Sequence, residues 1–402
     1  MTLAEIPAIL ILLGIAAYVV LAGADFGAPF WSLTARGKRG KEIRVATHQA
    51  MAPVWEANHV WLIFVLVVCW TIYPEVFASI FSTLWIPLLL ACLGIIMRAV
   101  GYMVSGVEDR TWVWVLATAA SFLTPFMLGS VVGALVAGEV PAGNAAGDLF
   151  TSWLNPTSIM IGILAVTVCA YLAAVYLAGD ARRTGRNELS EAFRTRGLVA
   201  GVVAGVVGVI GIAVLNEDAG RVYDGLTSGA GLVAVLLSAV AGLLTIASLT
   251  VRRFDLARFS AAAAVVAMVA GWGLAQEPEM LPGLTIESAA ASNNVIIGLL
   301  VSVAIGLLIL IPSLLLLYGL VLGGRFDPGG EIADTGSGRP VAGLDPARTG
   351  IVVATLVAAA IGWTLTFVSD SGPGLYLGVA LVLLTLFGGG VMLAFSLVSD
   401  DQ

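Results

Sequence analysis

The sequence predicts an all-α, polytopic membrane protein. Of its 402 residues, 59% are hydrophobic and only 11% are charged, whereas a soluble domain carries roughly 25% charged residues. The 47 glycines suit the close packing of helices in lipid. Apolar segments of about 20 residues, the length that a spanning helix needs, recur along the chain. These observations together favour about 11 transmembrane helices.

The predicted spans follow one another with short connections. They cover residues 6–24, 50–72, 76–97, 112–137, 157–178, 198–215, 229–250, 259–275, 294–322, 350–369 and 375–397. The longest connection, 323–349, is rich in Gly, Asp and Pro, which is typical of a flexible loop. We therefore expect a nine-helix membrane domain over 1–322, a cytoplasmic loop over 323–349 and an additional C-terminal helix pair over 350–402.

The basic residues predict the orientation. If the spans alternate in direction, 18 of the 19 Lys and Arg residues lie on one side, and only Arg221 lies on the other. The positive-inside rule makes the basic side cytoplasmic, so we expect the N-terminus outside and the C-terminus in the cytoplasm. Because these basic residues are dispersed among loops, they do not indicate nucleic-acid binding.

Asp25 is the first candidate functional residue. It lies near the cytoplasmic end of the first span, between Gly23 and Gly27. The two glycines are four residues apart, so one helix face allows a neighbouring helix to approach closely. Asp25 is either a proton-carrying carboxylate at a helix contact or an interfacial acid that is solvated or paired with a loop cation.

The second span carries an acid, an amide and an imidazole at Glu56, Asn58 and His59. Glu56 and His59 are three residues apart, so both can face one cavity. A carboxyl group there can take up and release protons, and the alternative is a buried pair that only holds two helices together. His59 could join a proton relay, ligate a haem or form a hydrogen bond between helices.

Arg98, Trp55 and Trp61 are further candidates for a functional or a structural role. Arg98 closes the third span and is expected to reach the lipid headgroups, with pairing to Asp25 or Glu108 as the alternative. Trp55 suits a core or interfacial position, and Trp61, beside the polar face, could gate a cavity. No Cys or carboxylate pair has the spacing of metal ligands, so no protein-only metal site is expected.

Three motifs together resemble the second subunit of cytochrome bd-type quinol oxidases. Residues 23–27 (Gly-Ala-Asp-Phe-Gly) resemble Gly-Phe-Asp-Leu/Met-Gly of that family. Residues 53–62 (Pro-Val-Trp-Glu-Ala-Asn-His-Val-Trp-Leu) resemble Pro-x-Trp-Asp-Gly-Asn-Gln-Val-Trp-Leu, and residues 98–102 (Arg-Ala-Val-Gly-Tyr) resemble Arg-Pro-Val-Gly-Phe. The chain departs from the family at Glu56, Ala57 and His59, and in its last two predicted spans.

The resemblance implies two four-helix bundles plus peripheral helices, and a complex in a bacterial or archaeal cell membrane. Its partner would be a haem-bearing subunit I with haem b and haem d. That subunit would oxidise quinol and reduce dioxygen to water. Small accessory subunits and membrane lipid are the other expected partners. This chain would stabilise that subunit. The assigned residues are Glu56, Asp25, His59 and Asn58 for a proton path, Trp61 for an oxygen route, and Arg98, Trp55, Gly23 and Gly27 for structure or interface.

Two other classes of function remain open from the residues. A proton-coupled secondary transporter could use Asp25 and Glu56 as coupling sites, although the sequence shows no convincing inverted repeat. A purely structural membrane scaffold would need neither acid.

Overall fold

The computed structural model describes residues 2–33, 55–105 and 111–322, together with isolated positions between 35 and 47 and between 357 and 381. The chain divides into two compact units, Met1–Phe326 and Asp327–Gln402. In the second unit only scattered helical positions such as Val357 and Ile361 are described. The predicted spans 350–369 and 375–397 therefore lie largely outside the described residues, and all elements named below belong to the first unit.

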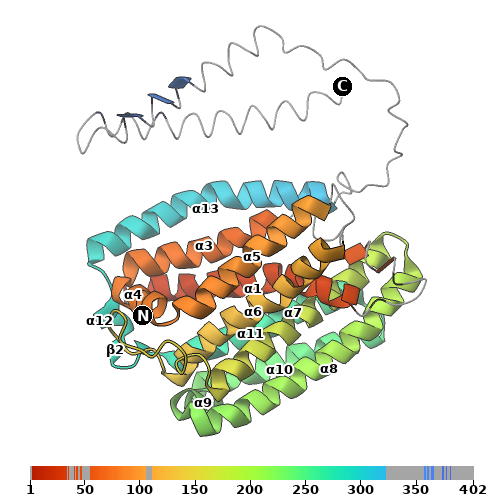
Figure 1. Ribbon diagram of the computed structural model, residues 1–402, viewed down its shortest axis with the longest axis horizontal. Coiled ribbons are helices and arrows are strands. Elements are labelled where there is room, and N and C mark those ends of the chain that lie inside the picture. Colours follow the sequence, from red (N-terminus) through yellow and green to blue (C-terminus); the bar gives the residue numbers. More distant parts are fainter. Residues whose placement is uncertain are drawn as a thin grey trace. The chain divides into compact units, whose positions relative to one another are not determined.

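The first unit consists of long helices and one small hairpin (Figure 1). The helices are α1 (Glu5–Leu33), α3 (Trp55–Ile72), α4 (Pro74–Thr83), α5 (Trp85–Ser105), α6 (Thr111–Ala137), α7 (Pro156–Arg183), α8 (Asn187–Asp218), α9 (Gly220–Thr227), α10 (Gly229–Thr250), α11 (Phe254–Gln276), α12 (Ile286–Ala289) and α13 (Asn293–Leu322). The strands β1 (Glu279–Leu281) and β2 (Leu284–Thr285) pair antiparallel.

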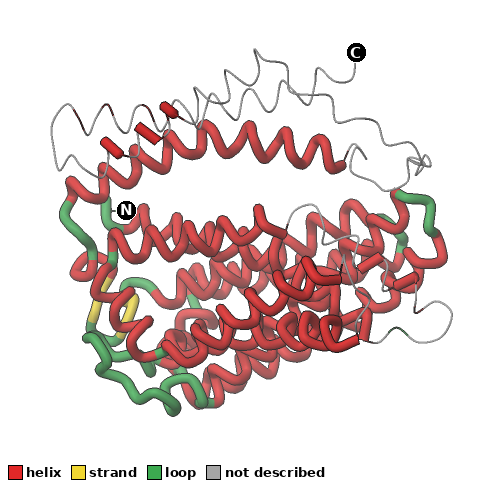
Figure 2. Tube along the Cα trace, turned by 45° about the horizontal axis from the view of Figure 1, so that its top comes forward, coloured by secondary structure: helices red, strands yellow, loops and turns green. Residues whose placement is uncertain are grey.

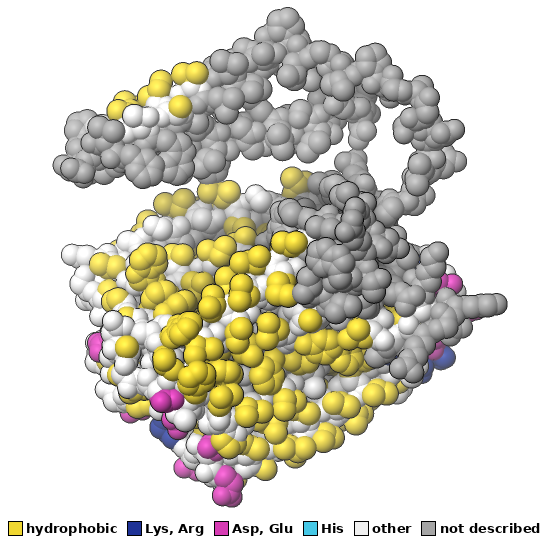
Figure 3. All heavy atoms as spheres, viewed as in Figure 1, with side chains coloured by type: hydrophobic (Ala, Val, Ile, Leu, Met, Phe, Trp, Pro, Cys, Tyr) yellow, Lys and Arg dark blue, Asp and Glu magenta, His cyan; other side chains and the backbone are white. Residues whose placement is uncertain are grey.

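Seven of the described helices are long and apolar enough to cross a membrane, or eight if the bent pair α3–α4 is one span. Figure 3 shows hydrophobic side chains over the middle of the visible face of this unit and charged side chains near its edges. Large apolar side chains such as Val209, Leu243 and Leu308 are more than 60% exposed, as lipid contact requires. The prediction of an all-α, polytopic membrane protein is confirmed.

The long helices run side by side (Figure 2), and their contacts divide them into two groups. In the first group α1 packs on α3 and α6, and α5 packs on α6. In the second group α7 packs on α8 and α11, and α10 packs on α8 and α11. Contacts of α1 and α6 with α7 join the groups, and α13 lies along α3 at the periphery (Figure 1). This arrangement agrees with two four-helix bundles plus a peripheral helix.

The predicted span 76–97 is divided in the structure. It forms α4 and α5, and α4 bends away from α3 by 119°. Pro74 begins α4, and because proline has no N–H it cannot continue the hydrogen-bond ladder of α3. The helix α5 then continues to Ser105, so Arg98 lies inside a helix rather than at its end.

The first span is longer than predicted, because α1 runs to Leu33 instead of residue 24. The extra turns are held against α7: the indole Nε1 of Trp31 donates a hydrogen bond of 2.8 Å to the carbonyl of Ala170. Ala28 and Trp31 join α7 side chains in one hydrophobic cluster. Asp25 consequently lies two turns before the end of α1, in the buried part of that helix.

The acidic segment that follows α11 contains the hairpin β1–β2 and the short helix α12, with Glu279 in β1 and Glu287 in α12. Thr285 and Ser288 close a capping box at the start of α12. Arg221 of α9 reaches this segment, since its Nη1 lies 3.6 Å from the Glu279 carboxylate and donates to the Gln276 carbonyl.

Candidate functional site

The structure brings Asp25, Asn58 and Arg98 together from α1, α3 and α5. The Asn58 side-chain amide donates to Asp25 Oδ2 at 2.5 Å, and a longer contact of 3.4 Å reaches the Leu21 carbonyl. The three side chains are only 6%, 2% and 7% exposed. The Asp25 carboxylate and the Arg98 guanidinium attract each other electrostatically. A carboxylate and a cation this deep in an apolar bundle are costly unless they compensate each other.

The expectation that Arg98 extends to the lipid headgroups is wrong, because its side chain is buried. Its guanidinium carbon lies 4.4 Å from the centroid of the Phe26 ring, a distance typical of a cation–π contact. Since α5 continues beyond Arg98, and Asp25 and Phe26 supply a negative charge and an aromatic face, the cation is accommodated inside the protein. The electrostatic attraction between Arg98 and Asp25 supports the alternative, in which Arg98 interacts with Asp25.

His59 lies beside this cluster and is surrounded by aromatic side chains. The centroid of its ring is 5.9 Å from that of Tyr18 and 6.0 Å from that of Phe26, both in edge-to-face geometry. A role of His59 as a haem ligand or as part of a proton relay stays a prediction.

Two residues at the cluster were not expected from the sequence. The Tyr18 hydroxyl is buried and has no hydrogen-bond partner among the described residues. Cys169 of α7 packs against Tyr18, Ala22 and Phe26. Tyr18 precedes Asp25 by seven residues, which returns to the same helix face, so helical periodicity could have found it. No sequence pattern indicates Cys169, because its position depends on how α7 packs on α1.

Gly23 and Gly27 both face α7. A Cβ atom added to Gly23 would lie 3.3 Å from Leu172 Cδ1, a tight contact. A Cβ added to Gly27 would collide with the backbone carbonyl of Cys169. The two glycines thus allow α1 and α7 to approach closely, and this contact fixes the helix that carries Asp25.

Trp61 is partly buried and packs against the cluster formed by Tyr18, Ala22, Phe26 and Cys169. Its ring centroid is 6.4 Å from that of Phe64. The side chains of Trp55 and Glu56 lie outside the described residues, although their backbone belongs to α3. Among the residues that the structure describes, no group of three or more His, Cys, Asp or Glu side chains could hold a metal ion.

An apolar groove of about 620 Å³ lies between α5, α6 and α7. Met97, Phe122, Phe126 and Ile163 are among its lining residues. Met97, which lines the groove, precedes Arg98 in α5, and the ring of Phe122 lies 5.3 Å from that of Phe30 in α1. Its lining is suited to an apolar solute rather than to an ion.

Comparison with solved structures finds the same fold in a known membrane complex. The bd oxidase from Geobacillus thermodenitrificans matches with a TM-score of 0.65 and 24% sequence identity. The match covers 80% of this chain and 99% of that chain. At this level of identity the likeness concerns the fold.

Two curated relatives are similar to parts of the chain. A putative cytochrome bd menaquinol oxidase subunit II of Bacillus subtilis is 21% identical over 213 residues, which cover 52% of this chain and 61% of the relative. Subunit 2 of the cytochrome bd-I ubiquinol oxidase of Escherichia coli is 28% identical over 151 residues, which cover 35% of this chain and 39% of the relative. The matches thus span less than two thirds of either relative.

The family comparison covers most of the chain. The model of the cytochrome bd terminal oxidase subunit II family matches residues 3–321, the same part in which α1 to α13 are found. The three motifs at residues 23–27, 53–62 and 98–102 all fall within this match. The chain belongs to the cytochrome bd terminal oxidase subunit II family.

Proposed function

We propose that this chain is the second subunit of a haem-containing quinol:dioxygen oxidoreductase in a bacterial or archaeal cell membrane. The observation that carries the proposal is the family match over residues 3–321. The relatives from Bacillus subtilis and Escherichia coli are named as menaquinol and ubiquinol oxidase subunits, which supports a quinol as the electron donor of the complex.

The partner in this proposal is a haem-bearing subunit I that holds haem b and haem d and supplies the redox chemistry. This chain stabilises that subunit, with small accessory subunits and membrane lipid as further partners. The exposed apolar surfaces of α3 and α5, with side chains such as Ile63, Trp70 and Ile96, offer area for helix packing within the membrane.

The buried polar cluster is the proposed proton path. Reduction of dioxygen consumes protons, and a buried reaction centre must receive them through side chains that can hold and pass them on. Asp25 can hold a proton on its carboxylate, next to the amide of Asn58. Glu56 is one helical turn from His59 in α3, and Tyr18 adds a hydroxyl beside the His59 ring.

The direction of this path follows from the charge distribution. Arg182, Arg183, Arg252 and Arg253 lie where α7 and α10 end, whereas Arg221 lies beside the hairpin. We infer that the arginine-rich end is cytoplasmic, which puts the N-terminus outside and the C-terminus inside. Asp25 in the last third of α1 then lies toward the cytoplasm, the side from which protons are drawn.

The apolar groove and Trp61 form the proposed oxygen route. Dioxygen is apolar and small, so it partitions into hydrocarbon and needs no polar groups along its way. The groove between α5, α6 and α7 has an apolar lining that includes Met97, the residue before Arg98 in α5. Trp61 packs on the same central cluster as Phe26.

Substitution of Glu56 tests the proton path. In the purified complex, Glu56→Gln removes a titratable group with little change of volume, so quinol-driven oxygen uptake should fall by about two orders of magnitude. The visible haem spectrum should stay near that of the wild type. Glu75→Gln, at an exposed position of α4, is the control and should leave uptake unchanged. Normal uptake by Glu56→Gln would exclude the relay role.

A further inference from the structure

A basic cavity lies where α7 ends and α11 begins. Its volume is about 380 Å³. The charged residues that line it are four arginines and one carboxylate: Arg182, Arg183, Arg252, Arg253 and Asp255. It is separate from the buried cluster around Asp25, and none of its lining residues belongs to the proposed proton path or oxygen route.

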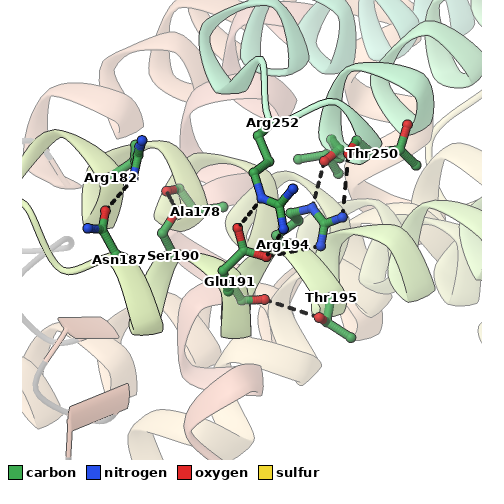
Figure 4. A network of polar contacts seen from close by, with 10 residues as sticks. Ala178, Arg182, Asn187, Ser190, Glu191, Arg194, Thr195, Thr250 and Arg252 are labelled. Carbon is green, nitrogen blue, oxygen red and sulfur yellow. Dashed lines mark hydrogen bonds and ion pairs between the residues drawn. The ribbon is translucent and has the colours of Figure 1, made fainter.

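The carboxylates near this cavity, with Asp255 of its lining included, neutralise its arginines only in part. Asp180 is shared by two guanidinium groups, at 2.8 Å from Arg183 and 2.5 Å from Arg258. Glu191 is likewise shared by Arg194 and Arg252, at 3.0 Å and 2.6 Å (Figure 4). Each of these carboxylates is thus paired with two arginines, so each set of three side chains keeps a net charge of +1.

The other two arginines of the cavity have no acidic partner among the described residues. Arg182 donates to the neutral side-chain oxygen of Asn187 (Figure 4), and the side chain of Arg253 forms no hydrogen bond or ion pair there. Arg253 also precedes the first turn of α11 without capping it. The free backbone N–H groups of that turn add to the attraction for an anion.

Exposed apolar side chains adjoin the arginines. Val251 is 64% exposed, Leu256 is 40% exposed and Phe259 is 73% exposed. Leu256 itself lines the cavity. A free phosphate would use only the arginines, whereas a phospholipid would place its phosphate on the arginines and its acyl chains on these apolar side chains.

We propose that this cavity binds the headgroup of an anionic phospholipid at the arginine-rich edge of the membrane. Guanidinium groups bind phosphate oxygens in a bidentate manner, and basic pockets between transmembrane helices suit anionic headgroups. The bound lipid would bridge α7 to the connection between α10 and α11, because its phosphate contacts arginines from both. This site goes beyond the oxidase function, since it involves neither quinol nor dioxygen.

The test measures lipid binding to the purified, delipidated complex by native mass spectrometry. Phosphatidylglycerol should bind and phosphatidylcholine should not displace it. Each lost arginine should weaken the binding about fivefold, so we expect about fivefold for Arg253→Gln and about 25-fold for Arg182→Gln combined with Arg253→Gln. Arg186→Gln is the matched control, because Arg186 lies on the same side but outside the cavity, and it should change affinity less than twofold.

Three results would overturn the proposal. Equal affinities of the wild type and the double variant would show that the cavity does not hold the lipid. Equal binding of phosphatidylcholine would show that the charge of the headgroup is irrelevant. Glycerol 3-phosphate that binds as tightly as phosphatidylglycerol would assign the cavity to a free phosphate compound. None of these readouts depends on oxygen uptake, so they are independent of the oxidase function.

Discussion

At the scale of the residue, the electrostatic attraction between Asp25 and Arg98 explains how two opposite charges are tolerated inside the first bundle. Both side chains are less than 8% exposed, and the Asn58 amide completes the environment of the carboxylate. A buried ion pair adds little stability overall, because desolvation offsets the attraction. Removal of one partner is costly, however, since the other charge stays buried without compensation.

This reasoning predicts the outcome of a double-mutant cycle. Asp25→Asn and Arg98→Met should each destabilise the purified complex by about 3–5 kcal/mol. The double variant should lose clearly less unfolding free energy than the two single variants lose together, because neither charge is then left buried without the other. The measurement is the unfolding free energy of all four forms under one set of conditions. Additive costs would contradict the pairing.

The sequence identifies these residues as candidates, but it does not predict that they lie close together in the structure. Asp25, Asn58 and Arg98 are recognisable because polar groups are rare in apolar segments. Their contact depends on the register of α1, α3 and α5, which side-chain packing decides and no local pattern encodes. For Arg98 the position at the end of a predicted span suggested lipid headgroups, whereas the longer α5 buries it.

At the scale of the element, the contact of α1 with α7 positions the whole site. It brings Gly27 so close to the Cys169 carbonyl that no Cβ fits between them. The same helices are linked by the hydrogen bond from Trp31 to Ala170. Small residues at such a contact let helix backbones approach closely in a membrane.

A single methyl group should therefore disturb this contact. Gly27→Ala should destabilise the complex by about 1–3 kcal/mol, as overpacking of a tight interior does. The control is Gly205→Ala in α8, where an added Cβ meets open space, and it should be neutral or stabilise by up to about 1 kcal/mol. Thermal unfolding midpoints of the two variants decide the question, and equal midpoints would contradict the close contact.

The predicted span 76–97 forms two helices, and average hydropathy does not predict this division. This span is apolar on average despite the polar residues of α4, so average hydropathy does not show that the chain bends by 119° between α3 and α4. The signals that could have found the break are Pro74 and Pro87, which open α4 and the first turn of α5. Proline is common in the first turn of a helix, where its missing N–H is not needed.

At the scale of the whole molecule, composition alone predicts the fold class and the motifs predict the family. Low charge and long apolar segments exclude a soluble domain, and the three motifs lead to the family that the comparison shows. The grouping of helices into two bundles comes from the resemblance, because apolar segments of similar composition do not state which of them pack together.

The most direct test of the account is purification of the tagged chain from its native membrane, followed by a reduced-minus-oxidised visible spectrum and a gel. We predict haem b and haem d bands, a co-purifying haem-bearing subunit and quinol-driven oxygen uptake. A colourless protein without a partner would contradict the oxidase function, and proton-flux measurements on Asp25 and Glu56 variants would then test a proton-coupled transporter instead.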